Sequence, residues 1–136
     1  MWEDNFVILF SSIKKKMYKL LNNKLKDYNL SIIEAIYLII LYDEKSLTFK
    51  ELTIKADCDK GMTTKVLVKL KMMGYVTYNI KNIEITDKGK LTGTKIKNII
   101  KELRNNLNKK IGEKELKNIY NELSNFNNIL EGELKC

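Results

Sequence analysis

The chain has 136 residues, enough for one domain with a substantial core, and its 44% hydrophobic and 31% charged residues are typical of a soluble folded protein. It contains no histidine and only two cysteines, Cys58 and Cys136, which lie far apart in the sequence. A Ser-His or Cys-His nucleophile is therefore excluded, and we expect no zinc or haem site and no disulfide framework. We expect no catalytic residues, no enzyme activity and no cofactor.

The net charge of +8 comes almost entirely from lysine, since Arg104 is the only arginine. Such a charge favours a polyanionic partner, either nucleic acid or an anionic membrane surface. Lysine-, asparagine- and isoleucine-rich usage is also typical of AT-biased coding, so charge alone does not decide between partners. The apolar run Phe6–Phe10 is too short to span a membrane and has no basic region before it. We expect a cytoplasmic protein with no membrane partner.

The first predicted element is a long amphipathic helix from Asp4 to Tyr28, because apolar residues recur at helical spacing and lysines occupy the other face. Its apolar face consists of Phe6, Leu9, Phe10, Ile13, Met17, Leu20, Leu21 and Leu25. Ser31 and Glu34 then form a capping box at the start of a second helix, Ile32–Tyr42. This helix is apolar nearly all round, which predicts a position in the middle of the domain. A polar turn, Asp43–Ser46, follows it.

The stretch Thr48–Val76 predicts a helix, a tight polar turn, a second helix and a strand. Thr48 and Glu51 form a capping box for the first helix, Asp59 can cap the second, and Gly74 ends it. The residues expected in the core are Leu52 and Ala56 of the first helix and Val66, Leu67, Leu70 and Met73 of the second. The outward face of the second helix then carries Lys60, Gly61, Met62, Thr64, Lys65, Val68 and Lys69.

Two short runs rich in β-forming residues come next, Tyr75–Tyr78 and Ile83–Thr86, separated by residues 79–82. They predict a small hairpin, the wing. Helical periodicity returns after Gly89 and is interrupted at Gly112, which predicts two further amphipathic helices. Helix, turn, basic helix and strand are the outline of a winged helix-turn-helix, which places a helix in the major groove of DNA.

In order and spacing these residues resemble the MarR family of bacterial transcription regulators, from about Leu30 to Lys90. The resemblance is carried by Leu30-Ser31-Ile32-Ile33-Glu34-Ala35, Thr48-Phe49-Lys50-Glu51-Leu52, Thr64-Lys65, Leu70 with Gly74-Tyr75-Val76, and Ile85-Thr86-Asp87-Lys88-Gly89. It implies a mainly α (α+β) fold in one domain, residues 1–136, with a winged unit at 30–90 and dimerisation helices at 4–28 and 91–134. The wing departs from the family pattern, because it is short and has no arginine, and Lys81 is the only charged residue at its tip.

The expected DNA-binding surface is the recognition helix, about residues 60–73, with its neighbours. Lysines there can reach phosphates or guanine edges, threonines suit phosphate oxygens or a thymine methyl, and glycine permits close approach of the backbone. The predicted DNA-binding residues are Lys60, Gly61, Met62, Thr63, Thr64, Lys65, Lys69, Lys81 and Lys50. A solvated lysine face is the plainer interpretation, and Met62 could instead pack onto the core.

The first and last helices have more apolar surface than a winged unit can cover. We therefore expect a homodimer whose interface includes Phe6, Phe10, Ile13, Leu123, Phe126 and Leu130, unless these helices fold back on their own subunit. A two-fold dimer would hold the recognition helices roughly 34 Å apart on duplex DNA and predicts a pseudo-palindromic site. The resemblance also implies a small-molecule effector as a further partner.

The expected function is that of a homodimeric, DNA-binding transcriptional regulator. Two alternatives stay open at this point. The arginine-free wing favours a winged unit that mediates protein interaction, and the abundance of lysine favours a sequence-tolerant architectural DNA-binding protein. We interpret Cys58 as a small buried hydrophobic residue rather than a redox switch, and Cys136 as inert.

Overall fold

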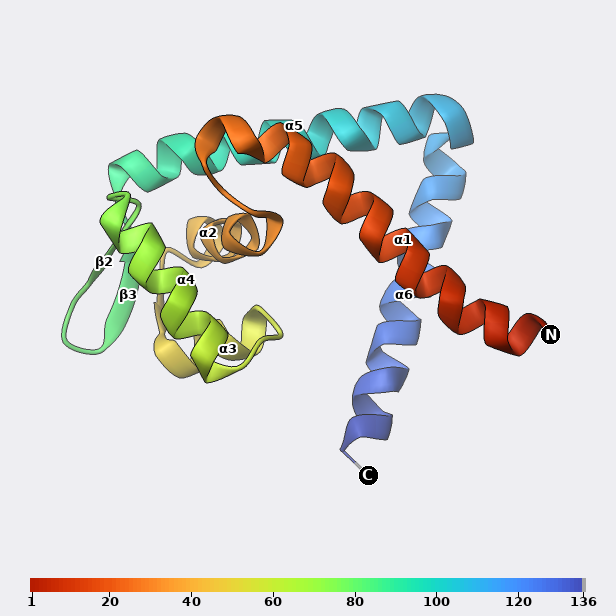
Figure 1. Cartoon of the computed structure of the whole chain (residues 1–136), viewed down its shortest axis with the longest axis horizontal. Helices are drawn as coiled ribbons and strands as arrows, with labels where there is room; N and C mark the ends of the chain where they lie inside the picture. The colour runs from red at the N-terminus through yellow and green to blue at the C-terminus, as the bar shows by residue number, and fades with distance from the viewer. Residues whose placement is uncertain (136) are drawn as a thin grey trace. The chain divides into compact units, whose positions relative to one another are not determined.

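The computed structural model describes residues 1–135, so Cys136 lies outside the described residues. The elements in chain order are α1 (Trp2–Leu25), a 3₁₀ turn η1 (Lys26–Tyr28), α2 (Ile32–Glu44), β1 (Ser46–Thr48), α3 (Phe49–Lys55), α4 (Lys60–Met72), β2 (Val76–Tyr78), β3 (Asn82–Ile85), α5 (Asp87–Ile111) and α6 (Glu113–Leu134) (Figure 1). The predicted mainly α fold with a small sheet is confirmed. The chain divides into two compact units, Met1–Ile99 and a second that starts at Ile100.

The helices of the winged unit begin at the predicted capping residues. Ser31 Oγ accepts from the Glu34 N–H at 3.3 Å, and Glu34 Oε1 accepts from the Ser31 N–H at 2.8 Å. Thr48 and Glu51 form the same reciprocal pair, at 3.1 and 3.0 Å. Asp59 Oδ1 accepts from an N–H in the first turn of α4 at 2.7 Å. Each cap stabilises its helix by about 1 kcal/mol.

Gly74 and Gly112 lie at the ends of helices, as the sequence predicted. Gly74 has φ +80° just after α4, and Gly112 has φ +98° between α5 and α6. Both values lie in the left-handed region that glycine adopts without steric cost. The sequence therefore predicted from local chemistry where α4 and α5 end.

The sheet has three antiparallel strands in the order β1-β3-β2, which corrects the prediction of a two-stranded hairpin. The residues Asp43–Ser46 are not simply a polar turn, because α2 continues to Glu44 and Ser46 begins β1. Strand β1 pairs with β3 through Leu47 opposite Ile83, and Leu47 is buried. So short a strand shows no alternation in the sequence; it exists because β3 offers it an open edge.

The end of the wing also differs from the prediction, since α5 begins at Asp87 and not beyond Gly89. Thr86 organises this junction: its hydroxyl donates to the Gly74 carbonyl at 2.6 Å and accepts from the Gly89 N–H at 3.0 Å. A Cβ at position 89 would lie 2.2 Å from the Tyr75 carbonyl oxygen, so only glycine fits this close approach. The junction fixes the hairpin against the start of α5.

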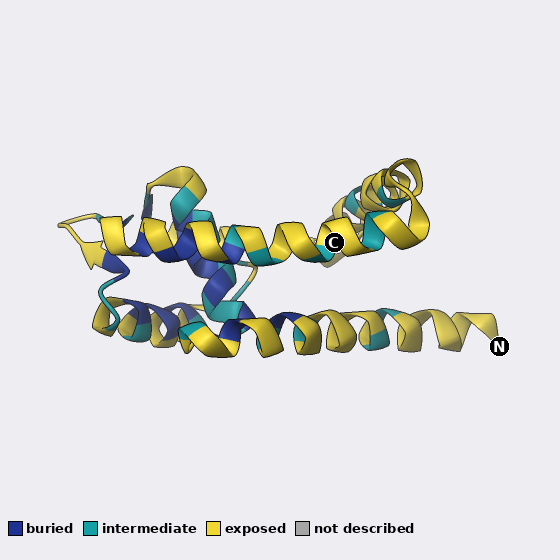
Figure 2. Ribbon diagram, turned by 90° about the horizontal axis from the view of Figure 1, so that it is seen from above, coloured by how far each residue is buried: buried dark blue, intermediate teal, exposed yellow. Residues whose placement is uncertain are grey.

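The core lies in the winged unit, where the buried residues gather (Figure 2), and α2 contributes its most deeply buried residues. The fully buried α2 residues are Ala35, Tyr37, Leu38 and Leu41. Around them pack Leu52 of α3, Val66, Leu67 and Leu70 of α4, Val76, Ile83 and Ile85 of the sheet, Ile96 of α5, and Leu21 and Leu25 of α1. Ala56 and Met73, which we expected in the core, are only half-buried. Within the described residues, no helix is both long and apolar enough to cross a membrane.

Candidate nucleic-acid interface

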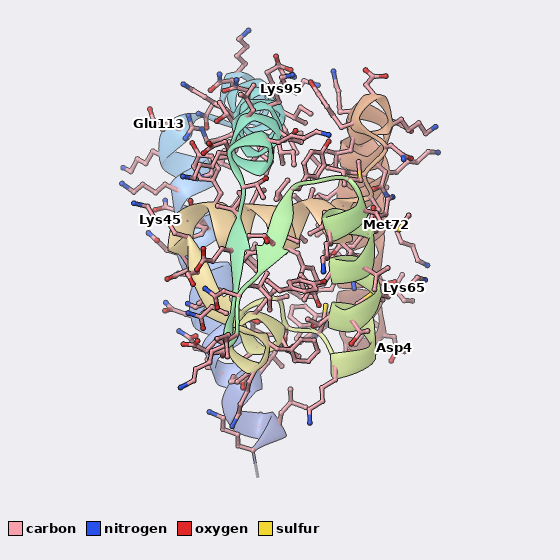
Figure 3. All side chains as sticks on the ribbon, turned by 90° about the vertical axis from the view of Figure 1, so that its left-hand side faces the viewer. Asp4, Lys45, Lys65, Met72, Lys95 and Glu113 are labelled. Atoms are coloured by element: carbon pink, nitrogen blue, oxygen red, sulfur yellow. The ribbon has the colours of Figure 1, made fainter. Side chains whose placement is uncertain are left out.

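The helix α4 presents one buried face and one exposed face. Val66, Leu67 and Leu70 pack inward, because residues three or four apart lie on the same side of a helix. Lys65 and Met72 are on the opposite, exposed side (Figure 3). With 13 residues, α4 is about 20 Å long, and an α-helix of ordinary width fits the major groove of duplex DNA. The packing therefore leaves a groove-sized ridge facing solvent.

Thr63 does not belong to that ridge, so its predicted contact with DNA is wrong. Its exposed fraction is 0%, because it lies on the buried face one turn before Val66 and Leu67. Its hydroxyl is 2.8 Å from the Tyr37 hydroxyl, 2.9 Å from the Thr53 hydroxyl and 3.1 Å from the Asp59 carbonyl. The spacing to the apolar residues was visible in the sequence, but the residue type suggested a surface position.

One arrangement of protons satisfies this buried cluster. When the Thr63 hydroxyl donates to the Asp59 carbonyl, the Tyr37 hydroxyl donates to Thr63. Burial raises the pKa of Tyr37 to about 12, which keeps its hydroxyl protonated and able to donate near neutral pH. Cys58 lies nearby, half-buried, and its thiol is 3.4 Å from the Ala56 carbonyl oxygen.

Lys69 is also set apart from the exposed lysines, because it forms an ion pair with Glu34 of α2. The Lys69 Nζ to Glu34 Oε1 distance is 2.8 Å, and the same carboxylate oxygen accepts from the Ser31 N–H. Burial alone would raise the pKa of Glu34, but the hydrogen bonds from Lys69 and Ser31 outweigh it and lower that pKa below 4.5. Much of the Lys69 charge is therefore neutralised within the chain.

The remaining predicted DNA-binding residues are accessible to different degrees. Those exposed on α4 are Lys60, Gly61, Thr64 and Lys65, whereas Met62 is half-buried. Lys50 is exposed in the first turn of α3, and Lys81 is exposed in the wing. Their contacts with DNA stay a prediction.

The wing tip is bridged by hydrogen bonds of the Asn79 side chain. Its side-chain oxygen accepts from the backbone N–H groups of Lys81 at 3.2 Å and Asn82 at 2.9 Å, and its amide donates to Glu84. Ile80, between them, is 100% exposed. A concavity of about 370 Å³ separates the wing from α4 and is lined by Phe49, Thr64, Leu67, Val68, Tyr78, Asn79, Ile80, Lys81, Asn82 and Ile83.

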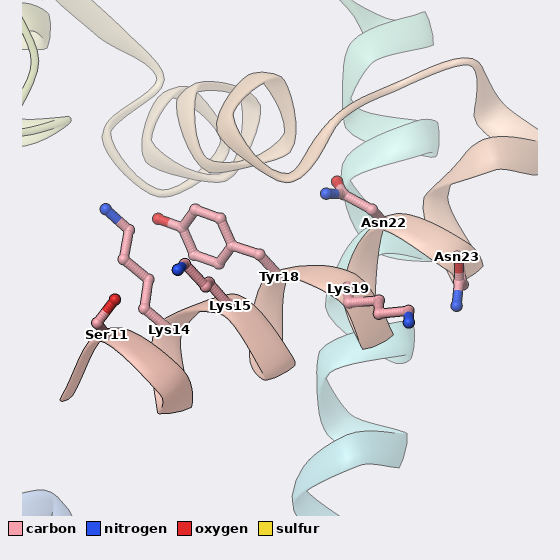
Figure 4. Close-up of a pocket in the computed structure, with 7 residues that line it drawn as sticks. All are labelled: Ser11, Lys14, Lys15, Tyr18, Lys19, Asn22 and Asn23. Carbon is pink, nitrogen blue, oxygen red and sulfur yellow. The ribbon is translucent and has the colours of Figure 1, made fainter. Parts of the chain in front are cut away.

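A second concavity, of about 570 Å³, lies along α1 and is basic. It is lined by Ser11, Lys14, Lys15, Tyr18, Lys19, Asn22 and Asn23 (Figure 4). The Lys14 ammonium is 5.4 Å from the centroid of the Tyr18 ring. Three lysines beside a phenol and two amides offer hydrogen-bond donors to an anion.

The apolar residues predicted at a dimer interface fall in both units, and each unit is considered separately. On α1, Phe6 and Ile13 are exposed and Phe10 is half-buried. On α6, Leu123 and Leu130 are exposed and Phe126 is half-buried. Each helix thus has an apolar stripe with solvent-accessible surface in the single chain.

No family model matches the chain, but comparison with individual proteins identifies relatives. Its fold is similar to that of a MarR transcriptional regulator from Methanosarcina mazei Go1, with TM-score 0.83, 23% identity and coverage of 94% of this chain and 91% of that one. It is also 30% identical over 125 residues to the HTH-type transcriptional regulator SarZ of Staphylococcus aureus (strain MRSA252), covering 87% of this chain and 83% of SarZ. This chain belongs to the MarR family.

The resemblance inferred from the sequence is thereby confirmed. A further member with the same fold is MepR of S. aureus, solved as a MepR–DNA complex, with TM-score 0.82, 19% identity and coverage of 92% of this chain and 97% of MepR. In this MarR-family chain, α3 and α4 are the helix-turn-helix and the β2–β3 hairpin is the wing. Sequence reasoning placed Val68 on the outward face but did not count it as a site residue.

The buried cluster predicts different outcomes for two neighbouring threonines. Thr63→Val should lower the free energy of unfolding by about 1–3 kcal/mol, because it removes the hydroxyl that is hydrogen-bonded to the buried Tyr37 and leaves only the weakly bonding thiol of Cys58 beside it. Thr64→Val, the matched control on the exposed side, should change it by less than about 0.5 kcal/mol. Urea denaturation followed by circular dichroism measures both. Equal losses for the two variants would contradict a structural role for the Thr63 hydroxyl.

The Glu34–Lys69 pair predicts a pH-dependent contribution to stability. Because the pKa of Glu34 is lowered on folding, its stabilisation is fully present above pH 4.5 and is lost as pH falls through the folded-state pKa. Glu34→Gln should therefore cost about 1 kcal/mol at pH 7, a modest value since solvent screens the more exposed Lys69. Denaturation curves from pH 7 to pH 3 should show the difference from wild type shrinking below pH 4.5.

The matched control for this prediction is Glu44→Gln, whose ion pair with Lys55 at 3.2 Å is exposed on both sides. It should have little effect on stability at pH 7. A Glu34→Gln effect that stays constant across the acid range would show that the carboxylate charge is not the source of the stabilisation.

Proposed function

We propose that this MarR-family protein is a homodimeric transcriptional regulator that binds duplex DNA with α4 in the major groove. The observation that carries the proposal is the exposed, lysine-bearing face of α4, set opposite a face that is fully packed. In the described part of the chain neither Lys60 nor Lys65 forms an ion pair, so both ammonium groups are available to phosphates. The MepR–DNA complex supports the proposal by family relationship.

Lys50 and Lys81 would extend this contact along the DNA backbone. Lys50 lies in the first turn of α3 and Lys81 at the tip of the wing, so they flank α4 from two different elements. Phosphate contacts of this kind fix the register of the protein on the duplex but carry no sequence information. Sequence discrimination is then assigned to the outward side chains of α4.

The homodimer is proposed from the apolar stripes of α1 and α6. An exposed apolar stripe on a long helix is costly in water and is stabilised when it is covered by another surface. Two-fold symmetry would set two copies of α4 roughly 34 Å apart, facing successive turns of the same side of the duplex. The preferred site would then be pseudo-palindromic. A small-molecule effector stays a prediction from the family resemblance.

The DNA-binding proposal is tested by the salt dependence of one variant. Lys65→Ala should weaken binding to a selected duplex, and the slope of log affinity against log salt should decrease by about 0.9, the value expected for loss of one phosphate contact. Lys101→Ala on α5 removes the same charge from an exposed position outside the winged unit and should leave the slope unchanged. Fluorescence anisotropy at several salt concentrations measures both variants.

The same titration separates the alternative functions. An unchanged slope for Lys65→Ala would reject the assignment of that residue. No salt-sensitive binding by the wild type even near 50 mM salt would favour a protein-interaction module. Equal affinity for every duplex tested would favour an architectural DNA-binding protein.

The dimer is tested by its mass in solution. The 15.9 kDa chain should sediment as a species of twice that mass in analytical ultracentrifugation. Ile13→Glu together with Leu130→Glu should shift it towards the monomer, because charges would be buried without partners at the interface. Ile54→Glu places the same charge on an exposed apolar position of α3 and should leave the dimer intact. A wild-type monomer at micromolar concentration would reject the proposal.

A further inference from the structure

We propose that Val68, together with the methyl group of Thr64, reads thymine methyl groups in the major groove, so that this regulator prefers thymine at the positions these side chains meet. The inference rests on the proposed function, since it needs α4 in the groove. It assigns part of the sequence specificity to an apolar pair rather than to hydrogen-bonding side chains.

Val68 is exposed without a structural reason. It is 53% exposed on α4, one turn after Thr64 and on the side opposite the packed residues Val66 and Leu70. Valine is a weaker helix former than the lysines around it, because its branched side chain loses rotamer freedom against the preceding turn. Neither helix stability nor core packing accounts for a valine at this position. Burial of this surface on binding a partner would account for the valine.

Thr64 presents its methyl group because its hydroxyl is engaged within the helix. The Thr64 Oγ1 donates to the Lys60 carbonyl at 3.0 Å. The hydroxyl proton is thus not available to a phosphate or a base acceptor while that bond persists. The methyl group is left beside Val68, since residues one turn apart on a helix surface have Cβ atoms about 5–6 Å from each other.

An apolar pair of this kind selects thymine among the bases. In the major groove only thymine presents a methyl group, and cytosine presents an amino group at the neighbouring position. The outward face of α4 has no arginine, asparagine or glutamine that could form a bidentate pair with guanine or adenine. Lys60 and Lys65 lie on either side of Thr64 in sequence, and their positive charge favours a polyanionic occupant over an apolar protein surface.

The apolar surface continues from α4 to the wing. Thr64 and Val68 form one wall of the concavity of about 370 Å³, and Tyr78 and Ile80 of the hairpin contribute to the other. Figure 3 shows the hairpin alongside α4, where Lys65 and Met72 mark its exposed side. Val68 is therefore part of a continuous surface facing the predicted position of the duplex and not an isolated exposed residue.

The experiment replaces single methyl groups on the DNA. A tight-binding duplex is selected from a random pool, and each thymine in turn is replaced by deoxyuridine, which lacks only the C5 methyl. At one or two positions in each half-site the wild type should lose about fourfold in affinity, the effect of withdrawing one buried methyl group. Fluorescence anisotropy at fixed salt measures each dissociation constant.

Variants then locate the contact on the protein. Val68→Ala should bind the thymine and deoxyuridine duplexes equally at one of these positions, and Thr64→Ser should do so at the same or the adjacent one. Leu91→Ala, which truncates an exposed apolar residue of α5 and lies outside the proposed contact surface, should keep the wild-type discrimination. Thermal melting by circular dichroism confirms that each variant is folded.

The outcomes separate this inference from the proposed function. Salt-sensitive binding by the wild type with no loss at any deoxyuridine would overturn the thymine reading and leave the regulator function intact. Full discrimination retained by both Val68→Ala and Thr64→Ser would overturn it as well. Absence of salt-sensitive binding to any selected duplex would overturn the proposed function and this inference with it.

Discussion

The rotational setting of α4 is fixed by the residues that it buries, and one of them, Thr63, adds a directional contact with α2. Successive residues of a helix are about 100° apart, so fixing one residue inward determines which residues face outward. Thr63 is fixed inward by its hydrogen bond with Tyr37, itself fully buried at the centre of the domain. Gly61, Lys65 and Val68 then lie on the opposite side. The surface that we propose for DNA is in this sense a consequence of packing and hydrogen bonding inside the core.

A second link between the same two helices reinforces this setting. Lys69 lies nearly two turns after Thr63 and is bound by Glu34, the residue that also completes the capping box of α2. The Glu34 carboxylate thus caps the start of α2 and also holds α4 in position through Lys69. Because the two links are on different turns of α4, rotation or sliding of the helix would break both. The exposed lysines Lys60 and Lys65 are carried on a helix that is fixed at both of these points.

The sequence predicted the features that depend on neighbouring residues. It missed the features that depend on pairing between segments far apart in the chain. The capping boxes at Ser31 and Thr48 depend on residues within one turn, and their hydrogen bonds form as expected. Strand β1 was missed because it exists only through its pairing with β3, far along the chain. Thr63 was misplaced because its partner Tyr37 is 26 positions earlier, and nothing in the residue type shows that a threonine is buried.

The wing shows why the outward face of α4 must account for most of the discrimination. Asn79 forms hydrogen bonds across the turn, but the turn presents the apolar Ile80 and a single cation, Lys81. Ile80 offers no hydrogen bond to a base, and of these two only Lys81 can reach a guanine edge. In the proposed two-fold dimer every α4 contact occurs twice, so a discrimination of about fourfold from one thymine methyl becomes roughly sixteenfold over two half-sites. A protein with few hydrogen-bonding readers can still select its site in this way, because symmetry multiplies a small apolar preference.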